Sequence, residues 1–281
     1  MRKICFGMIV GLAALTVSAQ TFPTKAVRLI MPLPAGGETD VFARTLAKQL
    51  NEAWGQQVVV ENRPGGGTSI GTDVASKAAP DGHTLLHTIT AHAINTTLYS
   101  KLPYDALKDF SCVTQIGNLY GVLLAHPSFP AKSIKELIAL AKARPGDITY
   151  ATGGSGTANH IAGEALRLAA DIKIQHVPYK GSSGAVNDLA SGRVTAMFSS
   201  LPSLQGVADK GLVRVIAATA PSTGKSTRNL PLMSASLPGF EYTSWYALYA
   251  PLATPVPVVN AINAALQRVL KDPAQIGRAH V

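Results

Sequence analysis

The sequence predicts an α/β protein built from two lobes that close around a ligand. Apolar strand patterns and amphipathic helix patterns alternate along most of the chain, which favours mostly parallel sheets. Two glycine-rich turns, at 32–37 and 151–157, each follow a strand pattern and precede a helix pattern. Because these turns lie far apart in the chain, two lobes with a cleft between them are favoured. One continuous doubly wound sheet is the alternative.

The first unit is predicted to contain three strands and two helices. The apolar runs that indicate the strands lie at 27–31, 58–60 and 84–89. Each helix between them has an apolar face at helical spacing. These faces carry Phe42, Leu46 and Leu50 in the first helix, and Ile70, Val74 and Ala78 in the second.

A strand over 119–126 is expected to lead into the second unit. The first helix there presents Ile134, Leu137, Ile138 and Ala141, and a later one presents Ile161, Ala165 and Leu168. The remaining strands are expected at 148–150, 174–177, 194–198 and 213–219, and the remaining helices at 185–190 and 203–210. An apolar stretch at 245–250 then returns to the first unit, ahead of an amphipathic helix at 258–270. Two crossings therefore join the lobes.

The ends of the chain have their own signals. Arg2 and Lys3 precede a short apolar stretch and the small residues Val17-Ser18-Ala19, which indicates a secretory signal peptide over 1–19, cleaved after Ala19. The first domain is expected at 20–120 and 240–281, and the second at 121–239. Residues 277–281 follow the last helix so closely that we expect a shortened reading frame, its last few residues not native.

The charge and the polar residues exclude several functions. The net charge is +9, but the Lys and Arg residues are scattered, which argues against nucleic-acid binding. His83 and His87 fall on a strand and lack the helical zinc motif, so we expect no metal. No catalytic constellation and no nucleotide loop emerges, so we expect no cofactor.

The glycine turns are the candidate binding groups. A helix N-terminus offers unpaired N–H groups and a partial positive charge, and glycine lets a ligand approach the backbone. The amides of Gly36, Gly37, Gly154 and Gly156 are therefore expected to hold a carboxylate from opposite lobes. His160, in the helix after the second turn, either reaches that carboxylate or packs on its neighbours.

Several ordered stretches resemble the substrate-binding proteins of the tripartite tricarboxylate transporters, the TctC-like or Bug receptors. The first turn, Met31 to Asp40, resembles their first binding loop. Further matches follow in the same order and extend the resemblance from about Phe22 to Pro273. They are Val58 to Gly66, Ala78 to Leu85, Leu102 to Asp105, His176 to Gly181, Pro238 to Phe240, Thr243 to Trp245 and Ala250-Pro251.

The resemblance implies a periplasmic, type II-like, two-domain binding protein that hands a small organic anion to a membrane permease and is not an enzyme. A monomer is expected. Carried over to this chain, the ligand residues are Leu33, Pro34, Gly36, Gly37, Thr88, Ser155, Gly156, Thr157, His160 and Ser199. Many family members have an aspartate where Ser199 and Ser200 stand, and a small hydroxyl residue where Glu38 stands. The missing aspartate favours a plain carboxylate over an amino acid, with ring carboxylates and amides as open alternatives.

Two other functions stay open from the sequence. A sensory protein that presents its ligand to a membrane kinase would use the same cleft. A secreted hydrolase would use Ser155 with His160, although the sequence assigns no acidic partner to that pair.

Overall fold

The computed structural model describes residues 22–200, 204–221 and 229–271. The predicted signal peptide, its cleavage after Ala19 and the terminal residues 277–281 lie outside these ranges. The described elements are β1 (Val27–Met31), α1 (Glu38–Trp54), β2 (Val58–Asn62), η1 (Gly66–Thr68), α2 (Ser69–Ser76), β3 (Thr84–Ile89), α3 (Ala91–Leu98), β4 (Phe110–Ala125), α4 (Ile134–Ala143), β5 (Thr149–Thr152), α5 (Ala158–Ala169), β6 (Gln175–Pro178), α6 (Ser182–Ala190), β7 (Ala196–Ser200), α7 (Gln205–Ala208), β8 (Arg214–Ala218), η3 (Met233–Ala235), β9 (Thr243–Pro251) and α8 (Val256–Val269).

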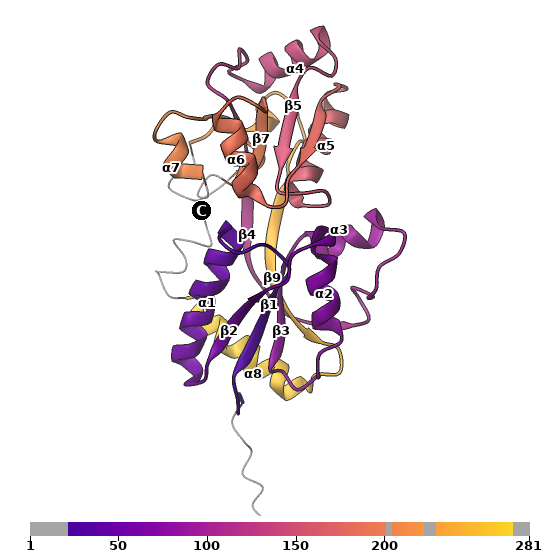
Figure 1. Ribbon diagram of the computed structural model, residues 1–281, viewed down its shortest axis with the longest axis vertical. Coiled ribbons are helices and arrows are strands. Elements are labelled where there is room, and N and C mark those ends of the chain that lie inside the picture. Colours follow the sequence, from indigo (N-terminus) through magenta and orange to yellow (C-terminus); the bar gives the residue numbers. More distant parts are fainter. Residues whose placement is uncertain (1–21, 201–203, 222–228, 272–281) are drawn as a thin grey trace, which may run out of the picture.

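Two lobes are joined by the long strand β4 and by β9, as the sequence predicts (Figure 1). The strands form one hydrogen-bonded path, β2-β1-β3-β9-β4-β7-β5-β6, with β8 on β4. Up to Tyr120, β4 pairs with β9, and from Gly121 onward it pairs with β7 and β8. Four central pairings are antiparallel: β3 with β9, and β4 with β7, β8 and β9. The expected parallel arrangement holds only toward the two edges, where β1 pairs with β2 and β3, and β5 pairs with β6 and β7. The alternative of one doubly wound sheet is therefore wrong, because β4 and β9 link the strands of the two lobes through antiparallel pairings.

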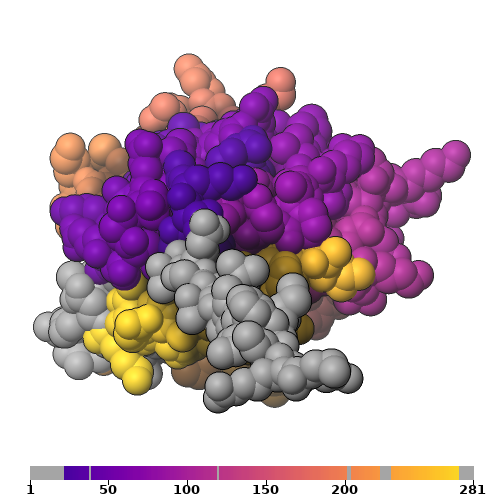
Figure 2. Space-filling view, turned by 90° about the horizontal axis from the view of Figure 1, so that it is seen from below, coloured from indigo at the N-terminus to yellow at the C-terminus, as the bar shows by residue number. Residues whose placement is uncertain are grey.

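Each lobe has its own hydrophobic core, and β4 contributes to both. Val113 and Ile116 pack in one core with α1 and α8, whereas Leu123 packs in another with α4 and α5. The return of the chain to the first lobe is visible from below, where α8 lies beside the N-terminal elements (Figure 2). Among the described residues, no helix has both the length and the apolar character needed to cross a bilayer.

The predicted inner faces of two helices are wrong in part, because Val74 and Ala165 pack against a core whereas Ile70 and Leu168 do not. Ile70 on α2 is 53% exposed and Leu168 on α5 is 68% exposed. Smaller side chains face the sheet instead, because they let the helix backbone approach closely. A Cβ on Gly71 would lie 2.8 Å from Pro32 Cα, and one on Gly163 would lie 2.2 Å from Tyr150 Cε2. The packing at Gly71 also fixes Pro32, where the first glycine turn begins.

Three elements differ from the expected pattern. Helix α3 was not predicted, since its sequence, AHAINTTL, is short and rich in threonine and asparagine. Strand β4 begins at Phe110 rather than at 119, because its first half crosses the lower sheet. Helix α7 spans only Gln205–Ala208 of the expected 203–210. Of these, α3 lies at the boundary between the lobes, outside the functional site (Figure 1).

Candidate functional site

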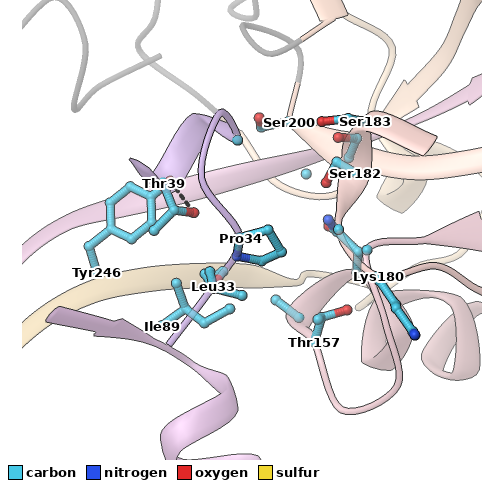
Figure 3. Close-up of a pocket in the computed structure, with 18 of the residues that line it drawn as sticks. Leu33, Pro34, Thr39, Ile89, Thr157, Lys180, Ser182, Ser183, Ser200 and Tyr246 are labelled. Atoms are coloured by element: carbon cyan, nitrogen blue, oxygen red, sulfur yellow. Dashed lines mark hydrogen bonds between the residues drawn. The ribbon is translucent and has the colours of Figure 1, made fainter. Parts of the chain in front are cut away.

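A cleft between the lobes is lined by both glycine turns (Figure 3). The first lobe and the crossing strands contribute Leu33, Pro34, Ala35, Gly37, Thr39, Ile89, Tyr120, Gly121, Tyr242, Ser244 and Tyr246. The second lobe contributes Gly153, Thr157, Ala158, Asn159, Lys180, Gly181, Ser182, Ser183, Ser199 and Ser200. None of these described lining residues is acidic. The ammonium end of Lys180 points away from the other labelled side chains in Figure 3.

Three helix N-termini converge on this cleft, one more than the sequence predicts. The N-caps are Gly37 for α1, Thr157 for α5 and Gly181 for α6. The second residue of each helix, namely Thr39, Asn159 and Ser183, also lines the cleft. The backbone N–H groups of these three residues have no hydrogen-bond partner within the described part of the chain. Each helix end adds about half a positive charge, so the cleft favours an anion.

The first turn is held by the buried carboxylate of Asp40. One of its oxygens accepts hydrogen bonds from Gly36 N at 3.0 Å and from Arg44 Nε at 2.9 Å. The other accepts from Asn62 Nδ2 at 2.9 Å. Burial alone would raise the pKa of Asp40, but the hydrogen bonds from Arg44, Gly36 and Asn62 outweigh it and lower the pKa. The N–H of Gly36 is thus used within the loop, and Gly36 does not line the cleft.

The second turn is supported by two stacked histidines. His160 Nδ1 accepts a hydrogen bond from Gly156 N at 3.2 Å, and the His160 ring stacks on His176 with centroids 4.1 Å apart. His176 Nε2 lies 2.7 Å from Thr152 Oγ1, which accepts from Gly154 N at 3.2 Å. A nitrogen that accepts must be unprotonated, and burial lowers the pKa of His160 accordingly. His160 therefore supports the turn rather than facing the cleft.

The structure brings half of the predicted ligand residues together. Leu33, Pro34, Gly37, Thr157 and Ser199 line the cleft, and Ser155 lines a second hollow, which shares Pro34 and Gly181 with the cleft. Four predicted residues line neither: Gly36, Gly156, His160 and Thr88. The N–H groups of Gly36 and Gly156 are used internally, and the side chain of Thr88 is fully buried in the sheet. The ligand-binding roles themselves stay predictions.

Two parts of the cleft were not identified from the sequence. The N-terminus of α6 has the same signal as the other two, because Gly181 follows strand β6 and opens a helix. Tyr246 on β9 had no local signal. Its hydroxyl lies 3.4 Å from Thr39 Oγ1, and its ring stacks on Phe42 with centroids 5.0 Å apart.

A buried histidine, His87, packs behind Tyr246 in the wall of the cleft. His87 is fully buried, with its ring centroid 5.4 Å from Tyr246 and 5.9 Å from Phe42. Neither ring nitrogen has a hydrogen-bond partner among the described residues. Burial lowers the pKa of His87 from 6.5 to about 4. The ring is therefore neutral in the folded protein at neutral pH.

We expect acid to destabilise the protein through His87. Between pH 6.5 and about pH 4 the unfolded chain binds a proton at this residue and the folded chain does not, so proton binding stabilises the unfolded state and lowers the free energy of unfolding. The loss amounts to about 2 to 3 kcal/mol at pH 4.5. Urea unfolding of the wild type and His87→Leu at pH 7 and pH 4.5 measures it. The variant should lose less stability on acidification, and an equal loss in both proteins would contradict this role.

Comparisons with known proteins place the chain among transporter receptors. Residues 42–279 match the TctC family, described as tripartite tricarboxylate transporter family receptor. Protein BugT of Bordetella pertussis (strain Tohama I) is 35% identical over 269 residues, which cover 95% of this chain and 82% of BugT. The structure of R. palustris Rpa4515 with adipate is similar, with TM-score 0.85 and 32% identity, over 90% of this chain and 86% of that one. MatC from Rhodopseudomonas palustris with bound malate gives TM-score 0.84 and 29% identity, over 92% and 88%.

Proposed function

Because the chain belongs to the tripartite tricarboxylate transporter receptor family, we propose that it captures a small carboxylate-bearing anion between its lobes and delivers it to a membrane permease. The family consists of periplasmic substrate-binding receptors rather than enzymes. The observation that carries the proposal is the convergence of the N-termini of α1, α5 and α6 on a cleft whose described lining residues include no Asp or Glu. The adipate and malate in two similar structures support the same ligand class.

Binding is coupled to lobe closure in this proposal. The N–H donors of α1 belong to one lobe, and those of α5 and α6 belong to the other. The boundary between the lobes lies where β4 changes its pairing partners, between Tyr120 and Gly121. A carboxylate held by both sets stabilises the closed state, because only that state brings the donors together. Each charge-assisted hydrogen bond contributes about 1.5–3 kcal/mol. A few of them, less the cost of ordering, give roughly micromolar affinity, or about −8 kcal/mol.

Titration calorimetry with a panel of small mono- and dicarboxylates, adipate and malate included, tests the proposal. We expect at least one acid to bind with roughly micromolar affinity. The ester with every carboxylate methylated serves as the matched control, because it keeps the carbon skeleton and removes the negative charge. Equal binding of acid and ester, or no binding across the panel, would contradict capture of a carboxylate.

The serine–histidine pair offers no support for a hydrolase. His160 Nδ1 already accepts the N–H of Gly156, and Ser155 lines the second hollow rather than the cleft. Between the side chains of Ser155 and His160, both of which the structure describes, there is no hydrogen bond.

A further inference from the structure

The lobes also touch outside the ligand cleft. Helix α3 of the first lobe meets the second glycine turn at Gly156, which lines no part of the cleft. A Cβ on Gly156 would lie 2.8 Å from Leu98 Cδ2 and 3.1 Å from Asn95 Oδ1. Such separations are shorter than carbon atoms in van der Waals contact allow. The two surfaces therefore meet this closely only because residue 156 has no side chain.

Asn95 fixes the first-lobe side of this contact. Its side chain is fully buried, and its Nδ2 donates to Gly67 O at 2.8 Å and to Thr68 Oγ1 at 3.2 Å. These bonds join α3 to the glycine loop at 65–67. Asn95 Oδ1 has no partner among the described residues and lies toward Gly156. The amide is thus anchored within one lobe and presents an oxygen to the other.

Leu98 adds an apolar part to the contact. Its side chain is 43% exposed at the end of α3, so the packing of its own lobe does not require a leucine there. The lobes also approach each other closely beside Leu98, where a Cβ added to Gly67 of the first lobe would lie 3.2 Å from Ser155 O of the second. The second hollow is lined on one side by Gly67 and Ser155 and also by Pro34 and Gly181, which line the cleft as well.

We propose that Asn95, Leu98 and Gly156 form a closure contact that stabilises the closed lobes without touching the ligand. The proposal rests on the proposed function in one respect, since ligand release requires the lobes to open. A contact made only in the closed state raises the closed population and slows dissociation, and leaves the encounter with the open form unchanged. These three residues are therefore positioning residues for ligand retention.

The test changes Leu98 and leaves the cleft intact. Leu98→Trp cannot fit against Gly156 in the closed state, Leu98→Ala removes the contact, and Leu98→Met keeps it. Leu107→Ala is the matched control, because Leu107 is 85% exposed and lies on the loop after α3. Spin labels at Lys48→Cys on α1 and Ser191→Cys after α6, with Cys5 and Cys112 replaced by serine, report the distance between lobes.

We expect Leu98→Trp to have a closed population at least threefold lower than that of the parent protein, measured under the same conditions. The comparison is made for the free protein and again with adipate or malate present. Ligand should dissociate about three to ten times faster, with an unchanged association rate. Leu98→Ala should show a smaller effect in the same direction, and Leu98→Met and Leu107→Ala should match the parent protein. If no carboxylate binds, the proposed function fails, and the distances in the free protein still decide this proposal. A parent-like closed population in Leu98→Trp, or no closed population in the parent, would overturn it.

Discussion

Gly37→Val is expected to abolish carboxylate binding while the protein stays folded. Gly37 lines the cleft as the N-cap of α1, and its φ of −79° suits any residue. The nearest atom to a Cβ built there is Pro34 O at 3.9 Å, so a Cβ has room, and we expect the two methyl groups that it carries to occupy ligand space beside the first-turn amides. We expect affinity to fall at least about 100-fold, or about 2.7 kcal/mol, measured by calorimetry against the best acid of the panel.

Two other glycines make this experiment specific. Gly206 in α7 also has open space around it, so Gly206→Val adds the same side chain away from the cleft and should bind normally. Gly36 is unsuitable for this substitution, because its φ of +81° would strain any other residue. A loss of binding could then not be distinguished from a loss of stability. If Gly37→Val binds as well as the parent protein, the first turn does not hold the ligand.

Ser183→Asp is expected to abolish binding and to leave the protein as stable or slightly more stable. Ser183 is the second residue of α6 and lines the cleft, so a carboxylate there repels a bound anion. At about 4 Å and an effective dielectric constant near 20, the repulsion is about 4 kcal/mol, which corresponds to a loss of affinity of about 1000-fold. The same charge suits the helix N-terminus and adds about 0.3–1 kcal/mol of stability. Calorimetry and thermal unfolding measure the two effects.

Ser133→Asp is the matched control for this charge. Ser133 caps α4, and its hydroxyl accepts from Glu136 N, a role that aspartate also performs. Helix α4 lies at the end of the second lobe that is remote from the cleft (Figure 1). Parent-like affinity in Ser133→Asp together with lost binding in Ser183→Asp places the anion near α6. Equal losses would instead indicate a long-range effect of net charge.

The sequence predicts those parts of the site that depend on local pattern. A strand, a glycine turn and a helix follow one another directly at Gly37 and at Thr157, so both N-termini were found. The wall made by Tyr120, Ser244 and Tyr246 depends on the pairing of β4 with β9, which are far apart in the chain. No local pattern specifies that register.

The sequence also leaves open which glycine amides are free. A glycine turn can present its N–H groups to a ligand or use them to hold its own shape. Gly36 and Gly156 donate to Asp40 and His160, and these bonds depend on how each side chain folds back on its turn. The buried face of a helix is also hard to predict from the sequence. The large apolar side chains of Ile70 and Leu168 suggested burial, but glycine and alanine pack against the sheet instead.

Backbone ¹H–¹⁵N chemical shifts during titration with the best carboxylate test the central claim most directly. The free amides of Thr39, Asn159 and Ser183 should shift strongly, because each gains a charged acceptor at a helix N-terminus. The internally bonded amides of Gly36 and Gly156 should shift much less. Large shifts at Gly36 and Gly156, with Thr39, Asn159 and Ser183 unmoved, would contradict capture by three converging helices.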